Sequence, residues 1–192
     1  MKLKDEVKEA RIKEVTLQLV AEEGLSGITM NRVAAAAGFS ASMIYTYFKG
    51  KTDLIEQTFL ECIERLKVIP EKINQKGIPF KVKVSLYFQY MLEVKCSKSS
   101  EYNFFKSFKQ SSYYKKKHQD ILIKNLSKST FDLLEEGRNY MILKNELDPL
   151  LLAALLDGFT EKLAEIHHQQ IIDLNQQMVE NAFSIFWDGI RQ

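Results

Sequence analysis

The side chains with the clearest chemical meaning in this sequence lie between residues 29 and 51. The only charged residues in that stretch are cations, namely Arg32, Lys49 and Lys51. Among them lies a set of small, hydroxyl and aromatic side chains without charge: Ala41, Ser42, Met43, Tyr45, Thr46 and Tyr47. Cations attract phosphates, and an uncharged surface can enter the major groove of DNA without like-charge repulsion. This combination indicates binding to duplex DNA.

Two short helices are predicted to position these side chains. Thr29 can cap a helix over residues 30–37, Gly38 can supply the left-handed residue that ends it, and Ser40 can cap a second helix over residues 41–47. A small core remains between them, filled by Val33, Phe39, Ile44 and Phe48. Two helices joined by a tight turn in this way form a helix-turn-helix.

The stretch resembles the N-terminal domain of the TetR family of bacterial transcriptional regulators. The resemblance rests on the helix lengths, on Gly38, on the run from Tyr45 to Phe48 and on Lys51 at the start of the next helix, and it covers roughly residues 8 to 66. It implies an all-α fold of about nine helices. A DNA-binding domain over residues 1–50, with the helix-turn-helix at about 29–48, would precede a helical effector-binding and dimerisation domain over residues 51–192.

The resemblance also implies roles for single residues. Near the first helix, Asn31 and Arg32 would meet phosphate or a base edge. On the second helix Ala41, Ser42 and Met43 would read bases, while Tyr45, Tyr47 and Lys51 would hold phosphates. The complete predicted DNA-binding set is Thr29, Asn31, Arg32, Ser40, Ala41, Ser42, Met43, Tyr45, Thr46, Tyr47, Lys49 and Lys51.

Apolar periodicity predicts helices along the rest of the chain. One helix spans residues 3–23, another runs from Lys51 until Pro70 ends it, and a third begins at Pro79. Ser100 can cap a helix, and a longer one after residue 112 would stop near Gly137. The last two helices would open at Asp148-Pro149 and at residues 173–176.

An effector pocket and a subunit interface are expected beyond the DNA-binding stretch. Aromatic residues on these helices are most often plain core, but the family resemblance implies a pocket for an apolar or amphipathic small molecule. The candidate lining residues are Phe59, Cys62, Tyr87, Phe88, Met91, Phe104, Phe105 and Phe108. The broad apolar faces of the last two helices indicate a dimer interface. Its candidate residues are Leu155, Phe159, Leu163, Phe183, Phe186 and Trp187.

Composition sets the wider limits. The chain has 192 residues, of which 45% are hydrophobic and 27% charged, and its formal net charge is +2. These values are ordinary for a globular protein. Two cysteines without Cys-X-X-Cys spacing favour a reducing compartment, and no signal segment or membrane span is apparent, so a cytoplasmic protein is expected.

Other sequence features argue against enzymatic or metal chemistry. The chain lacks a phosphate-binding glycine loop and a Gly-X-Ser-X-Gly elbow, so neither an enzyme nor a cofactor is expected. His167 and His168 beside Glu165 point about 100° apart on a helix, which does not suit a metal site. The basic run at Lys115, Lys116 and Lys117 is best explained as a solvated helix face; the alternative is attraction for an anionic ligand or neighbouring DNA.

Two functions from different classes follow. The first is a transcriptional regulator, most simply a homodimeric repressor that binds a near-palindromic operator and is released by a small-molecule effector. An activator would use the same residues. The second is a helical dimeric module that binds a small molecule or a protein without binding an operator. Salt-dependent binding to duplex DNA separates the two classes.

Overall fold

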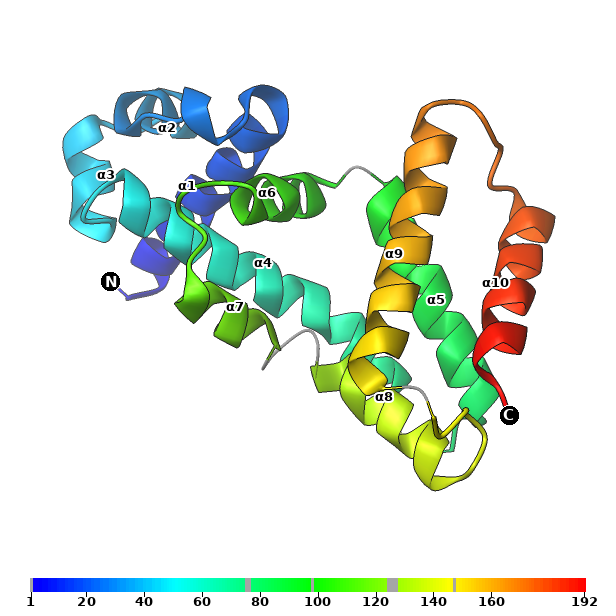
Figure 1. Ribbon diagram of the computed structural model, residues 1–192. Coiled ribbons are helices and arrows are strands. Elements are labelled where there is room, and N and C mark those ends of the chain that lie inside the picture. The colour runs from blue at the N-terminus through cyan, green and yellow to red at the C-terminus, as the bar shows by residue number, and fades with distance from the viewer. Residues whose placement is uncertain (1, 75–76, 98, 124–127, 147) are drawn as a thin grey trace. The chain divides into compact units, whose positions relative to one another are not determined.

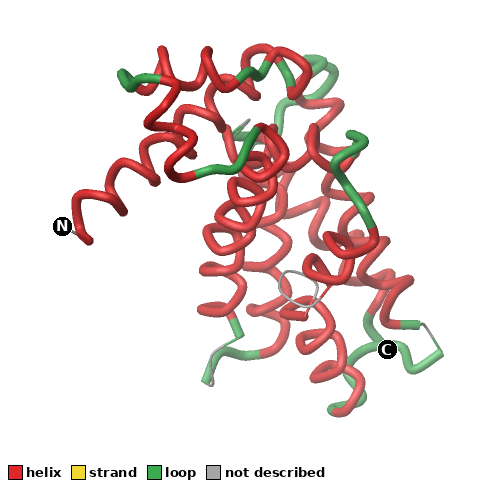
Figure 2. Tube along the Cα trace, turned by 90° about the vertical axis from the view of Figure 1, so that its left-hand side faces the viewer, coloured by secondary structure: helices red, strands yellow, loops and turns green. Residues whose placement is uncertain are grey.

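The computed structural model describes residues 2–74, 77–97, 99–123, 128–146 and 148–192. All extended regular elements among the described residues are helices, which confirms the predicted all-α class, and the only β feature of these residues is an isolated bridge between Leu143 and Arg191 (Figures 1 and 2). The elements are α1 (Lys2–Glu23), the 3-10 helix η1 (Leu25–Gly27), α2 (Met30–Ala37), α3 (Ala41–Tyr47), α4 (Lys51–Ile73), α5 (Phe80–Cys96), α6 (Ser100–Lys109), α7 (Lys116–Leu122), α8 (Lys128–Asn139), α9 (Pro149–His168) and α10 (Gln176–Ile190).

The chain forms two compact units. The N-terminal unit comprises Met1–Arg65 and Ser99–Gln119, and the C-terminal unit comprises Leu66–Lys98 and Asp120–Gln192. The N-terminal unit therefore contains α6 in addition to the helix-turn-helix. This division of compact units differs from the functional division predicted at residue 50, which stays a prediction.

Aromatic rings form the centre of the N-terminal unit. Phe59 on α4 stacks on Phe108 of α6 at a centroid distance of 4.4 Å, and the rings of Phe104 and Phe108 lie 6.1 Å apart. All three are fully buried. Near this core Arg65 donates hydrogen bonds to carboxylates on three helices, namely Glu14 at 3.0 Å, Glu61 at 2.6 Å and Glu101 at 2.9 Å. Contacts of both kinds join α6 to α4, and the bonds of Arg65 also reach α1.

A buried histidine, His118, lies against the aromatic core of the N-terminal unit. Its ring meets Phe59 and Phe108 edge-on, its Nδ1 accepts the Lys115 backbone N–H at 3.0 Å, and its Nε2 lies 3.5 Å from a Glu56 oxygen. Burial lowers the pKa of His118 below its ordinary value of 6.5; Glu56 opposes this shift, while Lys117 and Lys115 add to it. The folded unit therefore favours the neutral ring.

We expect the free energy of unfolding to fall as the pH drops below about 6.5, because the unfolded chain then takes up a proton that the folded chain resists. Above that pH, the contribution of His118 to the free energy of unfolding is fully present. Urea unfolding on both sides of pH 6.5 measures the effect. A His118→Asn variant, which cannot titrate there, should lose this part of the pH dependence, and an unchanged pH profile would contradict the assignment.

The C-terminal unit is built around α5, which packs against α8, α9 and α10. Phe88 on α5 is fully buried and lies within 6.0 Å of three other rings, those of Phe159, Phe183 and Phe186. A buried lysine, Lys95, donates to the Asp157 carboxylate at 2.7 Å. Because the charge is paired, its burial is tolerated.

Two predictions about the extent of helices were wrong. Pro70 does not end α4, because the carbonyl of Leu66, which Pro70 leaves without its helical donor, accepts the Tyr90 hydroxyl at 2.6 Å instead. α8 ends at Asn139, two residues after Gly137, which agrees with the predicted end near Gly137. The single long helix predicted after residue 112 is two helices, α7 and α8; residues 124–127, between them, lie outside the described residues.

Candidate nucleic-acid interface

The helix-turn-helix has the predicted bounds to the residue. The Thr29 hydroxyl accepts the Arg32 N–H at 3.2 Å, and the Ser40 hydroxyl accepts the Met43 N–H at 3.3 Å. Gly38 adopts a φ of 77°, and its N–H donates back to the end of α2. A side-chain cap begins a helix at a defined position, and a left-handed glycine ends one. These three residues therefore fix where α2 begins, where it ends and where α3 begins.

All twelve predicted DNA-binding residues are exposed or partly exposed, and none is buried. They are brought together on α2, α3 and the start of α4 within the N-terminal unit. Tyr45 is the most accessible large apolar residue of this group, with 56% of its surface exposed. The side chains of Ile44 and Phe48 turn inward and are buried. The uncharged face of α3 is thus available to a partner.

Two of the hydroxyls on α3 are engaged with the protein. Thr46 donates to the Met43 carbonyl at 2.6 Å, and the Ser40 and Ser42 hydroxyl oxygens lie 3.0 Å apart. The oxygens of these side chains keep accepting capacity, but the Thr46 donor is used within the helix. Among the predicted base-reading residues, Ser42 is the one with a hydroxyl at the first turn of α3.

Arg32 has partners that the sequence did not indicate. Its guanidinium forms an ion pair with Glu23 at the end of α1 and donates to the Gly27 carbonyl at 3.3 Å. The pair is half-exposed. Part of the Arg32 charge is therefore compensated, and the side chain also ties α2 to the end of α1.

Two acidic residues bond to groups that were predicted to face phosphates. Asp5 on α1 accepts the Tyr47 hydroxyl at 3.2 Å, so a phosphate would have to replace Asp5 as the acceptor of this one donor. Asp53 in the first turn of α4 accepts the Lys49 backbone N–H at 2.7 Å and the Gln57 side chain at 2.9 Å. The bond from Gln57 and then that from Lys49 lower the pKa of Asp53 against the opposing effect of burial. An acidic residue three positions into a helix is a local signal that could have predicted this cap; the contact of Asp5 with Tyr47 has no such signal.

The predicted effector residues fall into two separate groups. Phe59, Cys62, Phe104, Phe105 and Phe108 belong to the N-terminal unit, whereas Tyr87, Phe88 and Met91 belong to the C-terminal unit. Phe105 and Met91 are partly buried, and the other six are buried in their cores. Burial raises the pKa of the Cys62 thiol to about 12, so it stays protonated at neutral pH.

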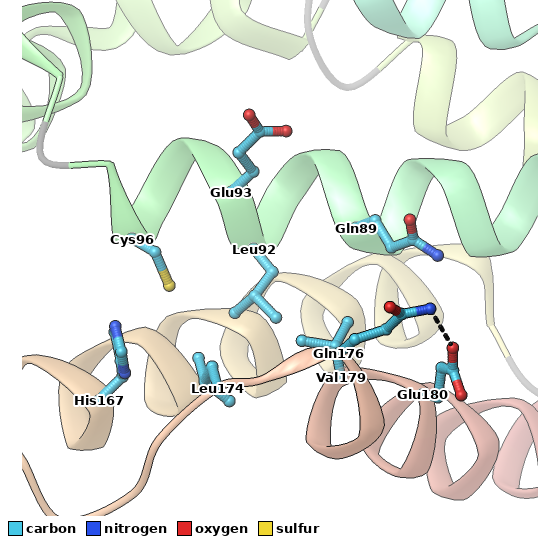
Figure 3. A pocket seen from close by; sticks show the side chains of 9 residues that line it. All are labelled: Gln89, Leu92, Glu93, Cys96, His167, Leu174, Gln176, Val179 and Glu180. Atoms are coloured by element: carbon cyan, nitrogen blue, oxygen red, sulfur yellow. Dashed lines mark hydrogen bonds between the residues drawn. The ribbon is translucent and has the colours of Figure 1, made fainter.

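A pocket of about 390 Å³ lies in the C-terminal unit between α5, α9 and α10 (Figure 3). None of the predicted effector residues lines it. Its lining residues are Gln89, Leu92, Glu93, Cys96, His167, Leu174, Gln176, Val179 and Glu180. In Figure 3 Leu92, Leu174 and Val179 lie near one another, and the Gln176 amide donates to Glu180 at 3.0 Å. The pocket therefore combines an apolar centre with polar groups, as small-molecule sites do.

The predicted dimer residues are not all at the surface. Phe186 and Trp187 are only 4% and 7% exposed and belong to the core of their unit, while Phe159, Leu163 and Phe183 are partly buried against it. Leu155 is 46% exposed. Further apolar side chains of α9 and α10 are exposed without having been predicted: Leu150, Leu151, Met178 and Ile185. Periodicity showed that both helices have broad apolar faces, but not which stripe the core would use.

Neither a membrane helix nor a metal cluster is found in the described part of the chain. Among those residues, no helix is long and apolar enough to cross a bilayer, and no group of three or more His, Cys, Asp or Glu residues could hold a metal ion. The two adjacent histidines bind backbone carbonyls instead, His167 to Ile172 at 3.3 Å and His168 to Lys95 at 3.1 Å.

Comparison with known proteins links this geometry to regulators. Residues 12–58 match the family model described as bacterial regulatory proteins, tetR family. An HTH-type transcriptional regulator of Staphylococcus aureus (strain MRSA252) is 27% identical over an alignment that covers 69% of this chain and 84% of the relative.

Solved structures share the fold along almost the whole chain. A TetR family transcription regulator from Marinobacter aquaeolei VT8 superposes with a TM-score of 0.87 at 18% identity, covering 100% of both chains. A putative TetR family regulator from Vibrio parahaemolyticus gives a TM-score of 0.79 at 23% identity, covering 96% of this chain and 99% of the other. These proteins carry the same helical architecture around their N-terminal helix-turn-helix.

Proposed function

Because this chain belongs to the TetR family of bacterial regulatory proteins and is a DNA-binding transcriptional regulator, we propose that it acts as a homodimeric repressor. In this proposal the dimer binds a near-palindromic operator and releases it when a small-molecule effector binds. The relatives and the fold are those of transcriptional regulators, which are not enzymes. The exposed face of α3, flanked by cations, is the observation that carries the proposal.

DNA binding is assigned to α3 and its two flanks. The uncharged face of α3 would enter the major groove, where Ala41 offers only apolar contact and Ser42 and Met43 complete the base-facing set. Tyr47, Lys49 and Lys51 would bind phosphates on either side. Asp53 supports this arrangement, because it holds the backbone at Lys49 and so fixes the start of α4.

Dimerisation is assigned to α9 and α10. Leu151 and Leu155 on α9 and Ile185 on α10 expose aliphatic surface that a partner could cover. Gly158 and Gly189 lie in the same helices, and a Cβ added to either would meet no described atom within 4 Å. Glycine costs a helix about 1 kcal/mol, and a closely packed partner helix would explain its use here. A two-fold interface would then pair α9 and α10 of both subunits.

An apolar or amphipathic small molecule is proposed as the effector. The predicted residues in the C-terminal unit, Tyr87, Phe88 and Met91, remain candidates, as do those of the N-terminal unit. The pocket of about 390 Å³ adds a further candidate site of the size that small ligands occupy. Its Gln89 and Gln176 amides could bind the polar end of an amphipathic molecule, and Leu92 the apolar end.

One helix could transmit the effector signal. α4 contributes Lys51 to the N-terminal unit and its residues from Leu66 to Ile73 to the C-terminal unit. A shift of this helix caused by ligand in the C-terminal unit would therefore displace a phosphate-binding end. A coupling of about 1 to 3 kcal/mol weakens DNA binding by roughly 5 to 150-fold, which is enough for a switch.

A gel-shift experiment with the DNA immediately upstream of the chain's own gene tests the proposal, because regulators of this family are often encoded beside the genes they control. Sequence-selective binding that weakens strongly between about 50 mM and about 200 mM salt is the expected result. Failure to bind either this DNA or a random duplex library would instead favour a binding module without an operator.

A further inference from the structure

The two ends of α1 each carry an acidic residue that contacts a predicted DNA-binding side chain. In the first turn of α1, Asp5 accepts the hydroxyl of Tyr47, the last residue of α3, at 3.2 Å. At the other end of α1, Glu23 forms an ion pair with Arg32 in the first turn of α2. Residues 29–51 themselves carry cations and no acidic residue. Folding therefore brings negative charge from α1 to a stretch that is cationic by itself.

The glycine at position 27 leaves room for the ion pair of Glu23 and Arg32. A Cβ added to Gly27 would lie 3.0 Å from a Glu23 carboxylate oxygen, 3.1 Å from the Glu23 Cβ and 3.7 Å from an Arg32 guanidinium nitrogen. Gly27 does not have the positive φ that favours glycine, so its missing side chain matters for space rather than for backbone conformation. Gly27 therefore permits the carboxylate to lie beside the guanidinium.

A DNA phosphate would compete with both carboxylates. A tyrosine hydroxyl has a single donor, so Tyr47 cannot bond to Asp5 and to a phosphate at the same time. A guanidinium has several N–H donors, so Arg32 could bind a phosphate and keep Glu23. The phosphate and the Glu23 carboxylate would then contact the same group, at a separation below the Debye length of about 8 Å, where salt screens their repulsion little. In both cases the carboxylate lowers the affinity of the side chain for phosphate.

We propose that Asp5 and Glu23 are internal competitors of DNA phosphates, which lower the affinity of this regulator for every duplex. This inference rests on the proposed DNA-binding function, with Tyr47 and Arg32 at phosphates. The preferred sequence would not change, because phosphate contacts carry no base information. A restrained affinity suits release by an effector, since a coupling that weakens binding by roughly 5 to 150-fold empties the operator only if the complex is not too tight.

Duplex binding by a Glu23→Gln variant, measured by fluorescence anisotropy, tests the proposal at the end of α1. Glutamine keeps a neutral acceptor for Arg32 and removes only the charge. We expect operator and random DNA to bind about two- to fivefold more tightly, because exposed ion pairs contribute free energies of that size. The matched control is Glu22→Gln, which removes the same charge from the adjacent exposed position and should change the affinity less.

A second pair of variants applies the same test at the start of α1. Asp5→Asn should also tighten binding by about two- to fivefold, because the Tyr47 hydroxyl bonds less strongly to a neutral acceptor than to a carboxylate. Its control is Glu6→Gln, at the next exposed position. Asp5 and Glu23 are eighteen residues apart, or about 27 Å along the helix axis, so the two gains should multiply in the double variant.

An Arg32→Gln background shows whether Glu23 acts through Arg32. In that background Glu23→Gln and Glu22→Gln should have equal affinities for DNA. A gain that persists there, or one that Glu22→Gln reproduces in the parent, would overturn the role of Glu23. Weaker binding by Glu23→Gln would overturn it too, because the ion pair would then serve only to position α2.

The remaining outcomes separate this inference from the proposed function. Equal affinities of Asp5→Asn and Glu6→Gln would overturn the role of Asp5. A gain of Glu23→Gln confined to the operator would overturn the competition with phosphates, because Arg32 would then contact a base. A parent protein without any salt-dependent duplex binding would contradict the proposed function itself.

Discussion

Replacing Leu155 with glutamate is expected to convert the proposed dimer into monomers and to abolish operator binding. Leu155 is 46% exposed on α9, in line with Leu151 one turn before it. Each residue of a two-fold interface occurs twice, so the substitution would place two carboxylates in one apolar contact. An unpaired buried charge costs about 3 to 5 kcal/mol, or at least a hundredfold in dimer affinity.

Sedimentation measured over a range of concentrations will report the dissociation. A Val82→Glu variant is the control, because Val82 on α5 is also 46% exposed and outside the helices assigned to the interface. It should remain dimeric. A Leu155→Glu protein that stays dimeric at the concentrations where the parent does would remove α9 from the interface. Loss of operator binding should accompany dissociation, because a monomer presents one helix-turn-helix to one half-site.

The double variant Tyr47→Ala, Lys51→Ala is expected to weaken binding to every duplex by roughly tenfold or more. Lys51 is assigned a hydrogen bond to phosphate, and a hydrogen bond to a charged group contributes about 1.5 to 3 kcal/mol. Tyr47 has one hydroxyl donor, so its bond to phosphate replaces the bond to Asp5 and contributes less. The loss should be nearly the same for operator and random DNA, because phosphate contacts do not distinguish sequences. Removal of Lys51 should also lower the salt slope by about 0.9.

Fluorescence anisotropy with operator and random duplexes measures both effects. Tyr140→Ala combined with Lys128→Ala is the control, since it removes the same two residue types from exposed positions in the C-terminal unit. Sedimentation should show that the double variant remains dimeric. Unchanged affinity would refute the placement of Tyr47 and Lys51 at phosphates. A loss confined to the operator would instead mean that these residues read bases.

The helix-turn-helix was predictable because neighbouring residues set the bounds of its two helices. Thr29, Gly38 and Ser40 each act on backbone groups within a few positions, and the observed α2 and α3 begin and end where these residues require. The exposure of the α3 face was predicted because Ile44 and Phe48 were assigned to the small core, which leaves the other side chains outward. Neighbouring residues were sufficient to predict these bounds. Only the structure showed the contacts of Asp5 with Tyr47 and of Glu23 with Arg32.

The sequence did not determine those features that depend on a distant partner. Pro70 remains inside α4 because Tyr90, twenty residues later, supplies a hydrogen bond to Leu66. The aromatic effector candidates all lie on apolar faces of predicted helices, and periodicity does not distinguish them. In the structure, however, Phe59 packs with α6 and Phe88 with α9 and α10. Likewise, the buried position of Trp187 depends on which stripe of α10 faces α5. Periodicity reports that a face is apolar, and tertiary packing selects its neighbour.

The N-terminal unit takes its core from two stretches of chain that are separated by more than thirty residues in the sequence. Phe59 is synthesised long before Phe108 and His118, on which its ring packs. During synthesis, the N-terminal unit therefore cannot complete its core until residues 99–119 have left the ribosome. A chimera that keeps only the first stretch, ending at Arg65, would leave the Phe59 ring uncovered. DNA specificity should therefore be exchanged between regulators by transplanting both stretches of the N-terminal unit together.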